Sequence, residues 1–245
     1  MTERLDAFLA RRGYGSRADV RRLIRSGAVT LDGSVCRDAA RHVEEGAEVR
    51  VRGEPAGARD VAATLILHKP VGYACSHDPR EAPLLDELVP ERFRHLPLQT
   101  AGRLDRDTSG LLVLSTDGAL IHALTSPRRK LEKRYRIAYR GRLPDDAAAR
   151  LCEGILLRGE ERPTLPARLE LEGATPDGLG RASLWLTEGR YHQVRRMMAA
   201  LGAEVVRLHR DRVGGLELPA DLPAGAARPL ADDERRRLLG PGAER

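Results

Sequence analysis

The irregular order of expected strands and helices after residue 63 most strongly limits how this chain can fold. Apolar runs and alternations predict strands at residues 65–68, 110–115, 134–139, 167–171, 182–187 and 204–208. Helical spacing of apolar residues is found at 84–88, 119–124, 145–153, 190–201 and 232–239. A doubly wound parallel sheet would need strands and helices in regular alternation. The sequence therefore favours an α+β fold with a mixed, mostly antiparallel sheet.

A small separate domain is expected at residues 1–59, formed by an αα-hairpin and short strands. Its helices are predicted around residues 5–9 and 20–24, and its strands at 28–31, 34–36 and 48–51. Residues 53–63 are rich in Ala and Gly, contain Pro55 and lack periodicity, as is typical of a linker. The larger domain is expected at 64–239, with residues 240–245 as a tail.

The charge of the chain favours an acidic partner such as a nucleic acid. Its 42 basic residues exceed its 36 acidic ones, and all but three of the basic residues are arginines, which bind phosphates bidentately. A GC-rich genome would also raise the arginine content. Seven arginines lie between residues 3 and 26. That cluster is either a nucleic-acid contact or simply a solvated face.

Several other classes of protein lose support. Residues 61–67 form the longest apolar stretch, too short to span a membrane, and the N-terminus lacks a signal peptide, so a cytoplasmic protein is expected. Cys36, Cys75 and Cys152 are widely spaced, and the histidines lack metal-ligand spacing. Dinucleotide-binding, P-loop and nucleophile-elbow motifs are missing. We therefore expect no metal site and no cofactor.

One segment, residues 101–112, combines carboxylates with arginines between apolar stretches. Asp105 lies between Arg103 and Arg106, and nearby cations favour an ionised carboxylate. Such a group beside an anomeric carbon acts as a nucleophile or stabilises a developing oxocarbenium ion. The alternative is an arginine–aspartate network that only braces a loop.

Two further segments each allow either a ligand-binding or a purely structural role. Tyr135 is surrounded by charges in residues 132–136, so it either stacks on an exposed base or faces the core of an amphipathic strand. Residues 188–198 predict a helix with arginines near its start, which is either an anion site or an ordinary surface helix. We expect His192 in that segment to pack or hydrogen-bond structurally.

Together these segments resemble the conserved motifs of pseudouridine synthases. Residues 102–111 resemble the catalytic-aspartate motif, 133–135 the tyrosine motif and 188–197 the third motif of that family. Residues 4–33 resemble an S4 RNA-binding domain, and S4 followed by this catalytic domain is the layout of the RsuA/RluB/E/F family. Residues 69–73 and 208–216 fit the same branch, and the order matches over roughly residues 4–236. Gly46-Ala47-Glu48 departs from the usual S4 pattern at one turn.

The resemblance implies isomerisation of uridine to pseudouridine in ribosomal RNA, without metal or cofactor. Asp105 would act on the ribose, by attacking C1′ or removing a sugar proton. Tyr135 would stack on the flipped base, and Arg195 would keep Asp105 charged by pairing with it. The candidate RNA-binding residues are Arg4, Arg17, Arg21, Arg25, Arg103, Arg106, Lys133 and Arg190.

The expected target is the small-subunit RNA. Residues 69–76 and 222–230 look closest to RsuA-type enzymes, which implies 16S rRNA and its uridine 516. The partner would be structured ribosomal RNA in an assembling subunit, and a monomer is expected because no large apolar stripe is left over. The alternatives are a 23S rRNA synthase of RluB/E/F type, a non-catalytic S4 RNA-binding or ribosome-assembly protein, and an S4-like unit that docks a protein.

Overall fold

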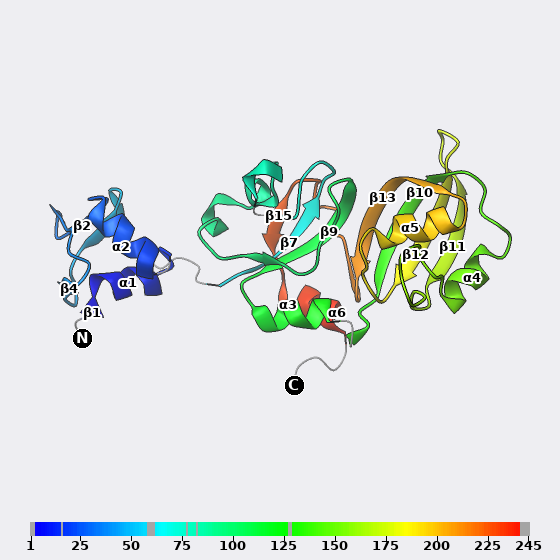
Figure 1. Cartoon of the computed structure of the whole chain (residues 1–245). Helices are drawn as coiled ribbons and strands as arrows, with labels where there is room; N and C mark the ends of the chain where they lie inside the picture. The colour runs from blue at the N-terminus through cyan, green and yellow to red at the C-terminus, as the bar shows by residue number, and fades with distance from the viewer. Residues whose placement is uncertain are drawn as a thin grey trace. The chain divides into compact units, whose positions relative to one another are not determined.

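The computed structural model describes residues 3–15, 17–57, 62–76, 78–81, 83–126 and 129–240. The chain divides into two compact units (Figure 1). The first comprises Met1–Ala63 with Pro90–Leu98, and the second comprises Thr64–Val89 with Gln99–Arg245. The sequence did not predict that residues 90–98 belong with the first unit. The centre of the expected linker, 58–61, and the tail beyond Gly240 lie outside the described residues.

The first unit contains two short helices and two small sheets around one core. Leu5 and Leu9 of α1 and Val20 and Ile24 of α2 are spaced four residues apart, so each pair faces the same side of its helix, and all four are fully buried. The elements are β1 (Glu3–Arg4), α1 (Leu5–Arg11), α2 (Arg17–Arg25), β2 (Val29–Leu31), β3 (Ser34–Val35), β4 (His42–Val43), β5 (Val49–Val51) and β6 (Glu54–Pro55).

The sheet of the first unit has the order β3-β2-β5-β6, and β1 pairs with β4. Asp32 and Gly33 connect β2 to β3 with φ of 48° and 78°, which is the left-handed geometry that an Asp-Gly hairpin turn requires. Arg50 and Val51 pair with Pro55 and Glu54. The prediction that the linker begins at residue 53 is therefore wrong, because this stretch still hydrogen-bonds to the sheet.

A nine-stranded, mostly antiparallel sheet forms the second unit, with the order β11-β12-β10-β13-β9-β7-β15 and with β14 and β8 added on β13 and β9. This confirms the predicted α+β fold class. The strands are β7 (Thr64–Lys69), β8 (Gln99–Thr100), β9 (Thr108–Ser115), β10 (Lys133–Arg140), β11 (Arg168–Ala174), β12 (Gly180–Leu186), β13 (Glu204–Val213), β14 (Leu216–Glu217) and β15 (Ala227–Pro229). β13 continues five residues beyond the predicted end at residue 208.

The two halves of this sheet join where β9 and β13 run parallel. Gly110 of β9 lies opposite Arg210 of β13. Its φ is +124°, and a Cβ atom there would lie 2.1 Å from the main-chain oxygen of Arg210. Only glycine tolerates this backbone and this close approach. The joint places the start of β9 beside the centre of β13.

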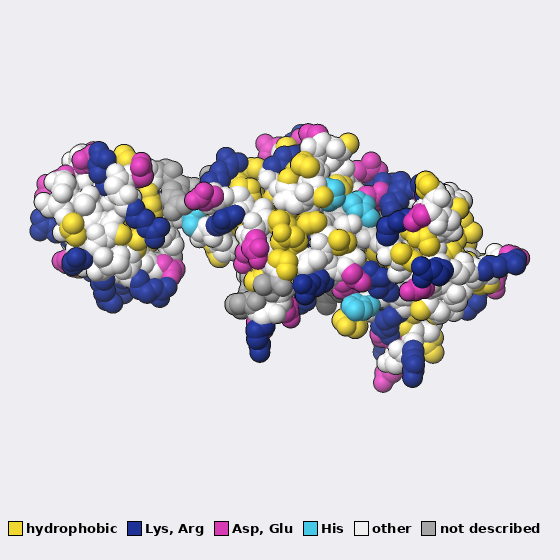
Figure 2. Space-filling view, turned by 90° about the horizontal axis from the view of Figure 1, so that it is seen from above, with side chains coloured by type: hydrophobic (Ala, Val, Ile, Leu, Met, Phe, Trp, Pro, Cys, Tyr) yellow, Lys and Arg dark blue, Asp and Glu magenta, His cyan; other side chains and the backbone are white. Residues whose placement is uncertain are grey.

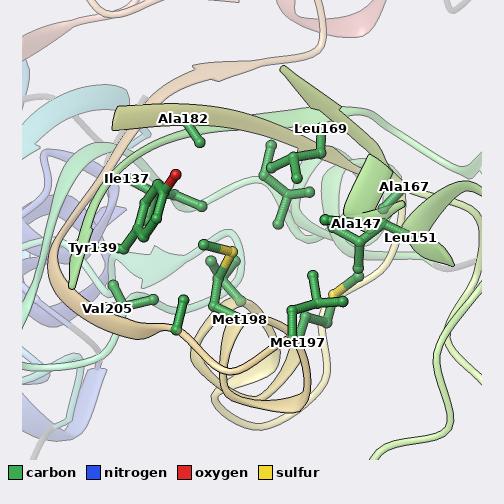
Figure 3. Packing of buried hydrophobic residues seen from close by; sticks show 14 of the residues in the cluster. Ile137, Tyr139, Ala147, Leu151, Ala167, Leu169, Ala182, Met197, Met198 and Val205 are labelled. Atoms are coloured by element: carbon green, nitrogen blue, oxygen red, sulfur yellow. The ribbon is translucent and has the colours of Figure 1, made fainter. Parts of the chain in front are cut away.

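The helices of the second unit cover different parts of the sheet (Figure 1). Leu120 and Leu124 of α3 (Gly118–Thr125) and Leu238 of α6 (Asp232–Leu239) share a core cluster with residues of β7 and β9. α4 (Ala147–Glu153) and α5 (Gln193–Ala200) cover β10–β12, and Met197 and Met198 of α5 point into that core (Figure 3). The α5 register presents the predicted apolar side inward.

The predicted helix at 84–88 is a short 3₁₀ turn, Leu85–Leu88, and further 3₁₀ turns lie at Pro79–Glu81 and Glu91–Phe93. Among the described residues, no helix combines the length and the apolar character needed to cross a membrane.

Candidate active site

A cavity of about 680 Å³ lies in the second unit where β9, β10, β13 and the segment before α5 meet. Its volume is in the range of pockets that enclose a small organic ligand. The wall is formed by residues 101–105, 108, 124–126, 133, 135, 186–195, 208 and 210. The three segments that the sequence singled out therefore line one cavity, although they lie up to about ninety residues apart.

Asp105 lies on the loop that leads into β9, with its side chain 37% exposed and facing the cavity. Leu104 beside it is buried and anchors the loop. Oδ1 of Asp105 lies 3.6 Å from Nε2 of His192. A partly exposed carboxylate in a cavity remains accessible to a ligand, whereas a carboxylate that only braces a loop is saturated with arginine donors.

Lys69 holds the main chain of this loop in place through hydrogen bonds from its ammonium group. It is fully buried at the end of β7, and its Nζ donates to the carbonyl oxygens of Thr108 at 2.8 Å, Asp105 at 3.0 Å, Pro70 at 3.1 Å and Arg106 at 3.4 Å. Burial lowers the pKa of Lys69, while the nearby anionic groups oppose that shift. The ammonium therefore acts as a cross-link that holds the backbone from Asp105 to Thr108 against the end of β7.

A second connection holds the same loop. The main-chain nitrogen of Gly72 donates to the carbonyl oxygen of Arg106 at 2.7 Å, and Nε of Arg106 donates to the carbonyl oxygen of Gly72 at 2.8 Å. Arg106 was predicted to contact RNA beside Asp105. The structure directs its Nε to the 70–72 turn, and Arg106 is not part of the cavity wall.

Tyr135 combines the two environments that its sequence context left open. It lies on β10, packs partly against the core cluster beneath α5, and also lines the cavity with Asp105. Leu184 and Arg210 flank it on the neighbouring strands in register. The supported ring is thus available to stack on a planar ligand in the cavity.

Arg195 lines the cavity but pairs with a different carboxylate from the one predicted. Its Nη2 lies 2.7 Å from Oδ2 of Asp107, and its Nη1 donates to the carbonyl oxygen of Val205 at 2.9 Å. The expected pairing with Asp105 is wrong for this structure. The contact with β13 holds the guanidinium on the Asp107 side of the loop.

His192 packs against a neighbouring ring, as the sequence suggested, but it does so on the wall of the cavity. It precedes α5 in the left-handed conformation, with φ of 49° and ψ of 33°, which is uncommon for a residue with a side chain. Its ring stacks on that of Tyr191 with 3.9 Å between centroids and 15° between planes. Tyr191 is 76% exposed, so this stacked pair lies at the mouth of the cavity beside Asp105.

The remaining residues of the second unit that were predicted to contact RNA differ in how far their charged groups are already bound by the protein. Arg103 is exposed on the cavity wall, and Lys133 also lines it. Arg190 lines the cavity too, but it is tied back to the protein by donation to Glu188, Glu160 and the carbonyl oxygens of residues 162 and 163. Arg190 therefore braces the wall rather than presenting a free cation.

Four predicted contacts lie in the first unit. Arg4 and Arg21 both donate to the buried carboxylate of Asp6, at 3.1 Å and 3.0 Å, and the pKa of Asp6 falls to about 2, mainly through the Arg4 hydrogen bond. Arg17 and Arg25 are exposed on α2. On the face shown in Figure 2, basic and acidic side chains are interspersed over this unit.

Sequence reasoning missed three residues of the site. Lys69 could have been noticed because it is one of only three lysines and follows an apolar strand directly before a proline. Arg210 follows Leu208 at a spacing of two and so shares its buried face, but the predicted strand stopped too early. Thr108 gave no signal, since a buried hydroxyl at the start of a strand is common.

Comparisons with known proteins agree with this geometry. A family model described as RNA pseudouridylate synthase matches residues 63–200, and an S4 domain model matches residues 3–49. The ribosomal small subunit pseudouridine synthase A of Escherichia coli K12 is 41% identical over 235 residues, covering 94% of this chain and 97% of the relative.

A relative from Bacillus subtilis 168, named uncharacterized RNA pseudouridine synthase YtzG, is 38% identical and covers 98% of this chain and 100% of its own length. A crystal structure titled as a pseudouridylate synthase superposes with a TM-score of 0.66 at 36% identity, covering 96% of this chain and 99% of the other. These matches extend through both units and include the cavity around Asp105. The chain therefore belongs to the RNA pseudouridine synthases and carries an S4 domain at its N-terminus.

Proposed function

We propose that this chain converts one uridine of ribosomal RNA to pseudouridine, and that its target is 16S rRNA at uridine 516. Two observations support the choice of RNA. The Escherichia coli relative named as a small-subunit enzyme matches over nearly its whole length, and residues 69–76 and 222–230 resemble the same type. A ribosomal RNA substrate also implies action in the cytoplasm.

The observation that carries the proposed chemistry is the partly exposed carboxylate of Asp105 in a cavity beside Tyr135. A base within a helix cannot reach such a cavity, so the target nucleotide flips out, which costs a few kcal/mol. Asp105 then acts on the ribose, by attack on C1′ or by removal of a sugar proton. Stacking on Tyr135 retains the detached base until C5 bonds to C1′.

The arginines near the loop have separate proposed roles. Arg103, exposed at the cavity wall, contacts the RNA next to the flipped nucleotide, by gripping a phosphate or filling the vacated stack. Arg195 acts through its ion pair with Asp107, which fixes the position of the Asp105 loop relative to α5. Arg106 supports the loop through the carbonyl of Gly72.

The S4 domain supplies a grip that depends little on sequence. Arg17 and Arg25 on α2 are exposed, whereas Arg4 and Arg21 also stabilise the domain through Asp6. Each phosphate contact releases a counterion, so affinity falls as salt rises. Replacing Arg17 and Arg25 should reduce the salt dependence of RNA binding without changing which uridine is modified.

The catalytic assignment is tested with Asp105→Asn. We expect normal folding by circular dichroism and no pseudouridine in a primer-stop assay on extracted RNA. Asp233→Asn is the matched control, because Asp233 is an exposed aspartate on α6, outside the cavity wall, that pairs with Arg237. Pseudouridine formation by Asp105→Asn at the rate of the control would end the assignment.

The target is tested by mapping pseudouridine across both large ribosomal RNAs with and without the gene. Loss of one site in 16S rRNA supports the proposal, and loss in 23S rRNA would replace it with a large-subunit enzyme. No loss in either would favour a non-catalytic S4 protein. Comparing free 16S rRNA with partly assembled subunits tests whether an assembling particle is the substrate, and light scattering tests the expected monomer.

A further inference from the structure

Arg210 is a buried cation on the wall of the cavity. It is 3% exposed on β13, and its Nε and Nη2 both donate to the carbonyl oxygen of Leu111, at 3.0 Å and 2.8 Å. Within the described residues, no carboxylate pairs with it. The double contact fixes the plane of the guanidinium, so its remaining donors have a defined direction.

Lys133 is a second cation on the same wall. It precedes Tyr135 by two residues on β10, so both side chains lie on the same face of the sheet. Its Nζ donates to the carbonyl oxygen of Leu131 at 2.9 Å, and it too lacks a carboxylate partner in the described part of the chain. Burial and the charge of Arg210 lower the pKa of Lys133 to about 8.

The arginines on the opposite face of β10 are less buried than Arg210, and they do have a carboxylate partner. Arg134 and Arg136 both donate to Asp211, at 2.8 Å and 2.9 Å. On the cavity face the two cations lie close enough to repel each other, and no carboxylate among the described residues pairs with either of them. Desolvating such charges without a partner is costly, so their retention indicates that a ligand supplies the missing negative charge.

The register of the sheet brings these groups around Tyr135. Arg210 lies directly opposite Tyr135 on the neighbouring strand, and Leu208, two residues before it, lies opposite Thr108 of β9. The hydroxyl of Thr108 is buried, borders the cavity and has no hydrogen-bond partner among the described atoms. Two cations and one free hydroxyl thus border the place where a ring stacked on Tyr135 would lie.

The chemistry of the reaction provides the negative charge. When the N1–C1′ bond breaks, its electron pair stays with the uracil and spreads from N1 to O2 and O4. This holds for both routes open to Asp105. After the base turns, C5 bonds to C1′; in the attack route this displaces Asp105 from C1′, and in the other route Asp105 returns the proton to the sugar. The C5 proton is then released to water and N1 takes up a proton, so the isomerisation balances.

We propose that Arg210 and Lys133, together with the hydroxyl of Thr108, bind the carbonyl oxygens of the uracil and stabilise its negative charge while it is detached from the ribose. The inference rests on the proposed roles of Asp105 and Tyr135. Preorganised donors aimed at developing charge in a site shielded from water lower a barrier more than donors in solution do. Arg210 and Lys133 are therefore further catalytic residues of this site.

The test compares Arg210→Gln with wild type on 16S rRNA transcripts that contain uridine or 5-fluorouridine, under single-turnover conditions. The fluorine withdraws electrons and makes uracil a better leaving group. Loss of the parent nucleoside is followed by mass spectrometry after nuclease digestion. We expect roughly a 100-fold slower first-order step on uridine with RNA affinity unchanged, as for removal of one oxyanion donor, and a smaller loss on 5-fluorouridine.

Two further variants keep the test decisive. Arg212→Gln is the matched control, because Arg212 is on the same strand but outside the cavity wall, with its Nε on the carbonyl oxygen of Gly214. We expect it to behave as wild type on both RNAs. If Arg210→Gln does not fold, Lys133→Met carries the comparison, since Lys133 is less deeply buried and is expected to show the same pattern with a smaller loss.

Equal reductions of the first-order rate on the two RNAs would overturn the inference. A residue with a merely structural role would slow both reactions alike, whatever the leaving group. A salt-dependent loss of RNA affinity with an unchanged first-order rate would also overturn it, by showing that the cations bind phosphate. Either failure leaves Asp105→Asn inactive. Failure of the proposed function itself is recognised by an active Asp105→Asn enzyme.

Discussion

Substitution of Lys69 by methionine would remove the ammonium that holds the Asp105 loop while keeping a side chain of similar length in the core. The lysine donates to four carbonyl oxygens, three of them within 3.1 Å. Two of these acceptors, on Asp105 and Arg106, also receive a main-chain hydrogen bond, from Thr108 and Gly72 respectively. The variant therefore loosens the loop without removing all of its contacts.

The magnitude follows from these contacts. A buried carbonyl that loses its donor costs about 1–3 kcal/mol, and relief from burying the ammonium offsets part of that sum. We expect a net loss of about 2–4 kcal/mol in the free energy of unfolding. Displacing a reacting group by about 1 Å lowers a rate by about 100-fold, so we expect a loss of that order in the first-order rate.

Urea unfolding and single-turnover pseudouridine formation measure the two effects. Lys130→Met is the control, because Lys130 is an exposed lysine and its substitution changes the total charge by the same amount. If Lys69→Met matched this control in both urea midpoint and rate, the reasoning that the ammonium fixes the Asp105 loop would be refuted.

Three further predictions concern stability. The pKa of Lys133 is about 8 in the folded protein and 10.5 in an ordinary lysine, so the unfolded chain binds more protons between these pH values. The free energy of unfolding of wild type should therefore rise by about 3 kcal/mol relative to Lys133→Met as pH increases from 8 to 10.5. A difference that stays constant in urea titrations at stepped pH would contradict this. Asp6→Asn should speed amide exchange in α1 at neutral pH. Since folding lowers the pKa of Asp6 to about 2, this difference from wild type should vanish as pH falls from about 4 through 2, and a difference that persists at low pH argues against the Arg4 pairing. Gly110→Ala should lower the free energy of unfolding by more than about 3 kcal/mol in urea, because its methyl group meets the main-chain oxygen of Arg210; an unchanged midpoint would show that the parallel strands can separate.

The sequence predicted most of the second unit because its cores follow simple periodicities. Met197 and Met198 fall on the apolar side of a helix, and both are buried as expected. β13 was cut short at residue 208 because its second half reads as charged. The burial of Arg210 there depends on strands far away in the sequence, and local patterning contains no information about them.

Within the site, the sequence identified which segments converge but not how their charges pair. Asp105 and Asp107 are two residues apart, and nothing local decides which of them faces Arg195. The carbonyl of Val205 decides it, through a tertiary contact. His192 gave an equally weak signal, since its approach to Asp105 depends on a left-handed backbone that sequence patterns seldom specify.

The position of β13 has a consequence for biosynthesis. This strand joins the two halves of the sheet, yet its residues leave the ribosome about a hundred positions after Asp105. Until β13 is inserted, a nascent chain exposes the edges of β9 and β10 and has only part of its pocket wall. Because β13 supplies Leu208 and Arg210 to the cavity wall, we expect pseudouridine formation to begin only after this strand has been synthesised and inserted.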